Sequence, residues 1–197
     1  MEAKKGNQRS RAYYKLAEID QKYKLFKRGD HVLDLGCWPG GWIQYSVEKV
    51  GKSGGVLGFD LKETDSFDEE NVSLHYLDLF EDIDEALDIC KNFFKTGCNS
   101  VISDLSPKLT GIKTTDRIQS VGLVERAYYF ASQFLVPGGS FVAKLFKSNE
   151  AEEFVRGIRK DFEKIYRKEL KSTRKTSSEF YVVATGKLKK VEEEEGL

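Results

Sequence analysis

Short apolar runs alternate with longer amphipathic stretches from about residue 30 to residue 185. This alternation is typical of an α/β sheet, in which amphipathic crossover helices join parallel strands. We therefore expect most of the strands to be parallel. The predicted strands cover residues 31–36, 54–61, 72–80, 100–106, 140–146, 164–170 and 179–186, and the predicted helices cover residues 10–23, 42–50, 83–94, 118–134 and 149–162.

The last two predicted strands are separated only by the polar stretch "KSTRKTSS", residues 171–178, which leaves no room for a crossover helix. We expect them to pair antiparallel at one edge of the sheet, because a short connection can close only an antiparallel pair. The expected fold is α/β: a seven-stranded, mostly parallel sheet with an antiparallel last strand and helices on both faces. This is the layout of the Rossmann-like methyltransferase fold, and a plain doubly wound sheet is the alternative.

The length of 197 residues is typical of one domain with its own core. We expect a single domain over residues 1–190, with a basic N-terminal helix region at 1–28 and an acidic, disordered tail at 191–197. Formal net charge is zero, yet residues 1–28 and 156–175 each hold nine basic and three acidic side chains, a local charge of +6. Such ends can present a basic face to a polyanion, because local potential steers association. Two solvated helices are the alternative interpretation.

No apolar run reaches the roughly 18 to 20 residues that span a bilayer, and the basic N-terminus lacks the apolar core of a secretory signal. The three cysteines form no CxxC pair, which argues against a disulfide framework and against a zinc site. We therefore expect a cytoplasmic monomer that holds no metal and does not bind membranes.

The first predicted strand runs into a glycine loop, "GCWPGG", residues 36–41. In open parallel sheets, ligands bind beyond the carboxyl ends of the strands, where this loop lies. A dinucleotide site needs a glycine at the position of Trp38, and no Gly-Lys-Ser/Thr sequence closes a Walker loop here. The loop therefore suits a nucleoside ligand without phosphate, such as S-adenosylmethionine, with Gly36, Gly40 and Gly41 giving close approach.

Carboxylates follow successive predicted strands. Asp60 ends "GFDL", where it can accept hydrogen bonds from both ribose hydroxyls, and Asp78 ends the third strand, where it can bind an adenine amino group. Asp34 can brace the loop or meet the methionine amine. Taken alone, each aspartate is more simply interpreted as a helix cap or turn residue. Their register with the glycine loop favours a cofactor site.

A lysine interrupts the apolar strand "SFVAKLF". Burying an unpaired ammonium is costly, so Lys144 needs a partner or must lose its charge; a solvated strand end is the alternative. Asp104 follows the fourth strand in "ISDLSP", Glu179 opens the last strand, and Lys15 lies on the helix before the first strand. These four residues are candidates for a catalytic group.

These stretches together resemble the FtsJ/RrmJ family of RNA ribose 2′-O-methyltransferases, whose members carry a Lys-Asp-Lys-Glu tetrad. The motifs "RSRAYYKL", "DLGCWPGGW", "SDLSPKLTGIKTTD", "FVAKLF" and "SSEFYVVA" extend over nearly the whole chain. The chain departs from the family at "CW" before "PGG", where members often have small residues. The resemblance implies S-adenosyl-L-methionine as cofactor and Lys15, Asp104, Lys144 and Glu179 as catalytic residues. The expected cofactor contacts are Asp34, Gly36, Trp38, Pro39, Gly40, Gly41, Trp42, Asp60, Leu61, Asp78, Leu79 and Asp104.

Methyl transfer to a ribose hydroxyl is an in-line displacement, and the alcohol is a poor nucleophile until its proton is leaving. An ordinary lysine, with a pKa near 10.4, is protonated at neutral pH, and the sequence leaves the protonation state at this site open. The hypothesis is that Lys144 accepts or orients the hydroxyl proton. Asp104 then positions Lys144 and the methyl donor, while Lys15 and Glu179 hold the ribose.

RNA is the substrate class that the two basic ends would serve, through phosphate rather than base contacts. The resemblance points to a uridine of 23S-type large-subunit ribosomal RNA in the assembled subunit. A transfer RNA anticodon loop, a non-catalytic ribosome-assembly role and a small-molecule substrate are the alternatives. An intact tetrad argues against the second, and the lack of an inserted lid segment argues against the third. The expected RNA contacts are Arg9, Arg11, Lys171, Arg174 and Lys175.

Overall fold

The computed structural model describes residues 8–170 and 178–189. The described elements follow in the order α1 (Ala12–Tyr23), β1 (His31–Leu35), α2 (Gly41–Val50), β2 (Gly55–Asp60), β3 (Val72–Tyr76), α3 (Ile83–Phe93), β4 (Cys98–Ser103), α4 (Lys113–Phe134), β5 (Leu135–Phe146), α5 (Asn149–Gly157), the 3-10 helix η1 (Ile158–Asp161), β6 (Phe162–Lys168) and β7 (Glu179–Lys187).

The strands form one seven-stranded sheet in the order β3-β2-β1-β4-β5-β7-β6. All pairs from β3 to β5 are parallel, and β7 runs antiparallel to both β5 and β6. The predicted fold class is therefore confirmed, with the last strand inserted between β5 and β6. The chain changes direction across the sheet between β3 and β4, so the carboxyl ends of β1 and β4 lie at the switch point where ligands bind in such folds.

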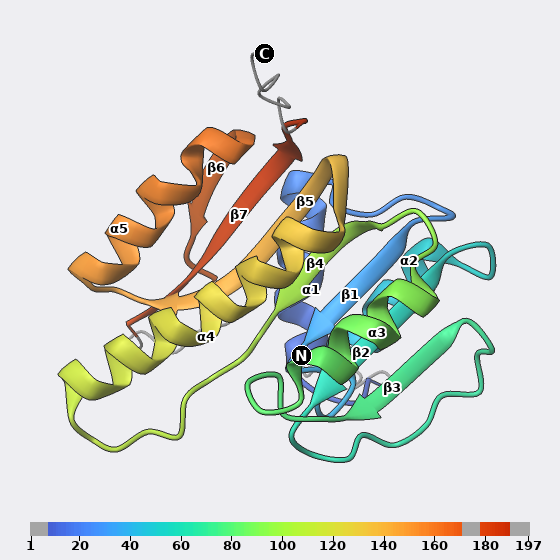
Figure 1. The fold of residues 1–197 in the computed structure, drawn as a ribbon, viewed down its shortest axis with the longest axis horizontal. Coiled ribbons are helices and arrows are strands. Elements are labelled where there is room, and N and C mark those ends of the chain that lie inside the picture. The colour runs from blue at the N-terminus through green and yellow to red at the C-terminus, as the bar shows by residue number, and fades with distance from the viewer. Residues whose placement is uncertain (1–7, 171–177, 190–197) are drawn as a thin grey trace, which may run out of the picture.

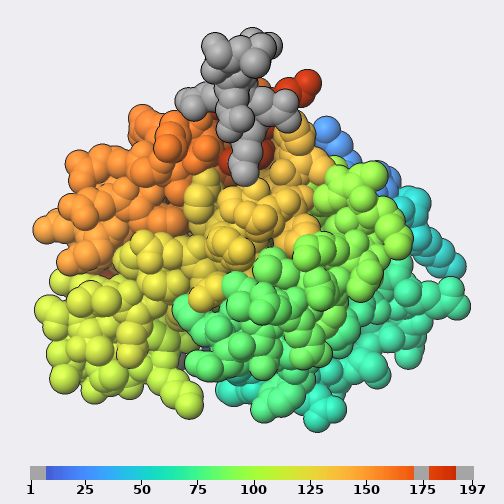
Figure 2. Space-filling view, in the orientation of Figure 1, coloured from blue at the N-terminus to red at the C-terminus, as the bar shows by residue number. Residues whose placement is uncertain are grey.

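Helices cover both faces of the sheet (Figure 1). One core lies between the sheet and α3, α4 and α5, and includes Phe59, Phe130 and Phe141. The other core lies beneath α1 and α2, and includes Leu16 and Ile43. In the space-filling view, α3 in green, α4 in yellow-green to yellow and α5 in orange close over the near face (Figure 2).

Two predicted boundaries, the start of α4 and the start of β5, are wrong. The helix begins at Lys113, five residues before the predicted start. The Asp116 carboxylate, which accepts hydrogen bonds from the Thr110 N–H and hydroxyl, both at 2.8 Å, fixes this first turn despite its lack of apolar periodicity. The helix ends at Phe134 as predicted, but the chain passes directly into β5 at Leu135, five residues before the predicted start of the strand at residue 140. The pairing of β5 with β4 has a register shift between Cys98 and Ser100, which accommodates the early start of β5.

Two further elements are shorter than predicted. The predicted helix over 149–162 is α-helical only to Gly157, continues as η1, and gives way to β6 at Phe162. β3 ends at Tyr76, so Asp78 lies two residues beyond its strand. Both predictions extended an apolar pattern across a change in backbone conformation. The predicted acidic tail at 191–197 lies outside the described residues.

A buried carboxylate fixes α1 to α2. Asp20 is 7% exposed and accepts hydrogen bonds from the N–H groups of Leu25, at 2.8 Å, and Phe26, at 3.3 Å. The hydroxyl of Tyr45 on α2 donates to the same carboxylate at 2.8 Å. The turn that leads from α1 to β1 and the packing of the two helices therefore share one acceptor.

Replacing Asp20 by Ala should lower the free energy of unfolding by about 2–3 kcal/mol, because buried donors lose their acceptor. Tyr45→Phe is the matched control and should cost about 1 kcal/mol, since the two backbone N–H groups keep Asp20. Urea denaturation of both variants measures the difference. A smaller loss in Asp20→Ala than in Tyr45→Phe would contradict this role.

Candidate active site

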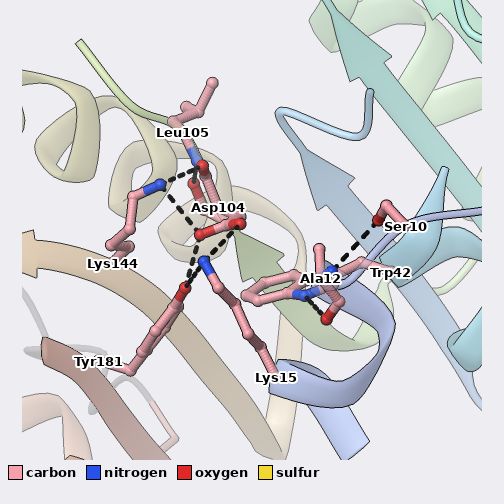
Figure 3. Close-up of polar contacts among 9 residues, drawn as sticks. Ser10, Ala12, Lys15, Trp42, Asp104, Leu105, Lys144 and Tyr181 are labelled. Atoms are coloured by element: carbon pink, nitrogen blue, oxygen red, sulfur yellow. Dashed lines mark hydrogen bonds and ion pairs between the residues drawn. The ribbon is translucent and has the colours of Figure 1, made fainter. Parts of the chain in front are cut away.

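Four side chains meet at the Asp104 carboxylate, just beyond the end of β4 (Figure 3). Lys144 Nζ lies 3.0 Å from Asp104 Oδ1 and donates to the Asp104 carbonyl oxygen at 2.8 Å. Lys15 Nζ lies 3.7 Å from Asp104 Oδ2. The Tyr181 hydroxyl donates to Asp104 Oδ1 at 2.7 Å. One carboxylate therefore joins β4, β5, β7 and α1; these four residues are called the Asp104 cluster below.

The alternation of β5 places Lys144 on the sheet face that α1 and α2 cover. Phe141, Ala143 and Leu145 pack into the core under α4, whereas Val142 packs under α1 and α2. Lys144 continues that second face and is only 7% exposed. Its side chain is thus buried within a strand, and its charge is met by Asp104, the residue that the sequence hypothesis placed beside it.

Tyr181 is a member of the cluster that the sequence analysis missed. It pairs directly with Lys144 across the β5–β7 ladder, so the two side chains lie on one face. Its hydroxyl also accepts a hydrogen bond from Lys15 Nζ at 3.3 Å. Burial raises the pKa of Tyr181 well above its ordinary value, and the negative charges of Asp104 and Glu179 raise it further, so the hydroxyl keeps the proton that it donates. The sequence feature that could have identified Tyr181 is its position two residues after Glu179, on the same side of an apolar strand.

Lys15 and Glu179 reach the site from opposite directions. Lys15 lies in the second turn of α1, with about a quarter of its side chain exposed. Glu179 is the first residue of β7, is half-buried, and pairs in register with Phe146 at the end of β5. The structure thus brings the four predicted catalytic residues to one edge of the sheet, and their catalytic roles remain predictions.

The glycine loop follows β1 and has two backbone positions that favour glycine. Gly36 has φ +85° and Gly40 has φ +98°. A Cβ on Gly36 would lie 2.9 Å from the Leu105 side chain, so the loop packs against the segment after β4. Gly41 has another role: a Cβ there would overlap the Ser10 hydroxyl, so this glycine admits the start of α1.

Trp42 joins α1, α2 and β7. The indole is 2% exposed, and its Nε1–H donates to the carbonyl oxygen of Ala12 at 2.8 Å (Figure 3). Its ring lies 5.9 Å from the Tyr181 ring, measured between centroids. The structure therefore gives Trp42 a packing role beside the Asp104 cluster, and its predicted cofactor contact remains a prediction.

Asp34 is a fully buried carboxyl at the end of β1. Neither of its side-chain oxygens has a hydrogen-bond partner among the described residues. Burial raises the pKa of Asp34 well above its ordinary value, and the charges of Asp104 and Asp60 raise it further. A buried acceptor of this kind fits a ligand that brings an amino group to the glycine loop.

The two other predicted carboxylates brace backbone at the same edge. Asp60 ends β2 and accepts the N–H groups of Trp38 and Lys62, each at 2.9 Å. Asp78 accepts the N–H of Phe80 at 2.8 Å. Their contacts with ribose and adenine remain predictions. The other predicted cofactor residues lie nearby in sequence, with Pro39 half-buried, Leu61 exposed and Leu79 buried.

Arg9 makes internal contacts that the sequence did not predict. Its Nη1 and Nη2 donate to the carbonyl oxygens of Asp65, at 2.6 Å, and Ser66, at 2.5 Å. The guanidinium also lies over the Phe67 ring, 3.6 Å from the centroid. Arg9 thus ties the N-terminal segment to the 61–70 loop. Arg11 is exposed before α1, and the other predicted RNA contacts, Lys171, Arg174 and Lys175, lie outside the described residues.

Within residues 8–170 and 178–189, no three His, Cys, Asp or Glu side chains are grouped so that they could hold a metal ion. The three cysteines are buried and unbridged. No described helix is both long enough and apolar enough to cross a bilayer.

The chain matches the model of the FtsJ-like methyltransferase family over residues 8–187. A ribosomal RNA large subunit methyltransferase E from Desulfatibacillum aliphaticivorans is 41% identical over 187 residues, which cover 94% of this chain and 87% of that protein. A solved ribosomal RNA methyltransferase from Plasmodium falciparum has a TM-score of 0.80 at 27% identity and covers 91% of this chain and 98% of that one. A fibrillarin from Aeropyrum pernix, solved with S-adenosyl-L-methionine, shares the fold at a TM-score of 0.59 and 16% identity, over 88% and 76% of the two chains.

The fold and the site at the strand ends define a Rossmann-like methyltransferase. The chain belongs to the FtsJ-like methyltransferase family, and the resemblance inferred from its motifs is confirmed.

Asp34→Asn should change how stability depends on pH in the cofactor-free protein. The folded-state pKa of Asp34 is raised, so the protonated carboxyl is favoured in the folded protein. Its contribution to the free energy of unfolding is therefore fully present below the unfolded-state pKa, near 3.9, and is lost as pH rises above it. The variant should therefore gain on the wild type between about pH 4 and 7, by at most about 1.4 kcal/mol per pH unit. Urea denaturation across this range measures the gap, and a pH-independent gap would contradict the prediction.

Tyr181→Phe should slow methyl transfer about 10-fold and lower the free energy of unfolding by about 1 kcal/mol, because Asp104 loses a donor and Lys15 an acceptor. Rate assays and denaturation measure the two effects. Tyr166→Phe, at a half-exposed tyrosine of β6, is the matched control and should change neither. A normal rate in Tyr181→Phe would show that the Tyr181 hydroxyl has no role in methyl transfer.

Proposed function

We propose that this methyltransferase uses S-adenosyl-L-methionine to methylate a ribose 2′-oxygen of RNA, in a uridine of 23S-type ribosomal RNA within the assembled large subunit. The Asp104 cluster carries the proposal, because two lysines meet one carboxylate beside the glycine loop. The name of the curated relatives, ribosomal RNA large subunit methyltransferase E, supports the ribosomal substrate. We further propose a single domain over residues 1–190 that acts as a monomer in the cytoplasm, where such a substrate is assembled.

The residues at the glycine loop fit this cofactor. Asp34 offers a buried acceptor for the methionine ammonium group, and Gly36 and Gly40 hold the loop in backbone conformations that favour glycine. Asp60 and Asp78 lie at neighbouring loops for the ribose hydroxyls and the adenine amino group. The fibrillarin that shares the fold holds S-adenosyl-L-methionine in its own structure.

When bound, S-adenosyl-L-methionine supplies a methyl group on a sulfonium, which a nucleophilic oxygen can attack in line. Lys144 Nζ has three positions besides its carbon, and Asp104 occupies two of them through its carbonyl and carboxylate oxygens. No other described residue forms a hydrogen bond or ion pair with Lys144 Nζ, and we assign the third position to a substrate hydroxyl. Lys144 then accepts the hydroxyl proton or orients it away from the attacking lone pair.

The other groups of the site hold this geometry. Tyr181 fixes the Asp104 carboxylate by donating to Oδ1, which keeps Lys144 in place. Lys15 lies within reach of both Asp104 and Tyr181, and Glu179 opens β7 at the same edge. We assign Lys15 and Glu179 to holding the ribose, since an ammonium can donate to the ribose oxygens and a carboxylate can accept from its hydroxyls.

Transfer of a radiolabelled methyl group tests the substrate. The acceptors are intact large ribosomal subunits, free large-subunit RNA and transfer RNA, each followed by mapping of the labelled nucleotide. Labelling of a uridine ribose in large subunits is the expected result. Labelling of transfer RNA alone would transfer the assignment to an anticodon loop, and no labelling of any RNA would overturn the proposal.

Lys144→Ala should reduce methyl transfer by about 10²- to 10⁴-fold, the range expected when a general base is removed, while the affinity for S-adenosyl-L-methionine stays within a few-fold. Calorimetric titration and single-turnover rates separate the two. Lys147→Ala is the matched control, because Lys147 is exposed and pairs with Glu169 at 2.7 Å. A normal rate in Lys144→Ala would show that the hydroxyl proton leaves by another route.

A further inference from the structure

Trp38 is an exposed aromatic ring on an otherwise packed loop. It is 48% exposed, whereas the preceding Cys37 is 3% exposed and Trp42 at the start of α2 is 2% exposed. An exposed indole is a large apolar surface, and such surfaces commonly mark binding sites.

The backbone around Trp38 is fixed by hydrogen bonds. The Asp60 carboxylate accepts the N–H of Trp38 with one oxygen and the N–H of Lys62 with the other, each at 2.9 Å. The N–H groups of Gly36 and Cys37 donate to the carbonyl of Phe59, at 2.9 and 3.1 Å. The ring is therefore presented to solvent from a loop that is anchored to β2.

A cation lies against the ring. Lys62 Nζ is 4.1 Å from the centre of the Trp38 ring, within the range of a cation–π contact. The pair thus offers an aromatic surface for stacking and a positive charge beside it. A nucleotide has the complementary groups, because its base can stack on an indole and its phosphate can meet an ammonium.

The pair lies at the same edge of the sheet as the Asp104 cluster, next to the end of β2, whereas Asp104 follows β4 on the other side of β1. Leu35 of β1 is level with Ser103 of β4, so the loops that begin with Gly36 and Asp104 leave the sheet together. Trp38 is two residues beyond Gly36, a reach of at most about 7 Å. A nucleotide of the same RNA strand, on the β2 side of the one at Lys144, is therefore the occupant that this position favours.

We propose that Trp38 stacks on a base of the RNA substrate next to the methylated nucleotide, with Lys62 meeting its phosphate. This rests on the proposed RNA methyltransferase activity and assigns Trp38 to the substrate rather than to the cofactor contact predicted from the sequence. Stacking accepts any base, so Trp38 holds the strand in place without reading its sequence.

Steady-state kinetics on RNA test the stacking. Trp38→Ala should raise the KM for RNA by roughly 5- to 150-fold, the range for loss of one stacked base, with little change in the affinity for S-adenosyl-L-methionine. Trp38→Phe should restore most of the loss, and Lys62→Gln should lower the salt dependence of RNA binding by about one ion. Tyr129→Ala removes an exposed aromatic from the far end of α4 and serves as the control.

Fluorescence supplies a second readout, because the chain has only two tryptophans. RNA should quench the emission of the wild type but not that of Trp38→Phe, in which the buried Trp42 alone remains. An unchanged KM in Trp38→Ala, or an equal loss of affinity for S-adenosyl-L-methionine, would overturn the proposal. Absence of RNA methylation by the wild type would instead overturn the proposed function, so the two failures are distinguishable.

Discussion

The Asp104 carboxylate is the interaction on which the rest of the site depends. A lysine buried within a strand is tolerated only if its charge is met by a partner and its remaining donors are satisfied. Asp104 meets Lys144 through both its carboxylate and its own carbonyl oxygen, and it receives Lys15 and Tyr181 as well. Three strands and one helix must therefore keep their relative positions for the charges to remain paired, which links the stability of this edge to its chemistry.

The N-terminal helix is part of this constraint. α1 carries Lys15, yet it lies outside the sheet and is held by contacts with α2. Trp42 bonds to α1, Gly41 leaves room for Ser10, and Asp20 receives Tyr45 at the other end of the helix pair. Since α2 begins in the glycine loop, the predicted cofactor loop and the helix that carries Lys15, a predicted catalytic residue, form one packed unit. A change in either therefore displaces the other.

Much of the fold could be predicted because its cause is local. Apolar strands alternating with amphipathic helices specify a mostly parallel sheet, and a short connection specifies the antiparallel pair. The errors lie where side chains outweigh local pattern, as when Asp116 fixes a polar first turn of α4, or where an apolar run crosses into another conformation, as at Phe162.

Tyr181 was missed because a tyrosine in a strand has the same sequence pattern whether or not its hydroxyl forms a functional contact. The charge of Arg9 alone predicted a contact with RNA. In the structure its planar guanidinium donates hydrogen bonds to two carbonyl oxygens and stacks on the Phe67 ring.

The sequence by itself predicted the fold class and the family, and it named Lys15, Asp104, Lys144 and Glu179 as candidates for a catalytic group, because each lies in a motif that can be recognised without coordinates. It also determined that Lys144 needs a partner, since that requirement follows from the cost of a buried charge. Only the tertiary structure showed how Asp104 meets Lys144, that Tyr181 completes the cluster, and that Asp34 is buried with no donor among the residues that the structure describes. It alone showed that Trp38 faces solvent while Trp42 is buried. These depend on which strand ends and helix faces come together in space, a property of long-range packing that spacing along the chain does not encode.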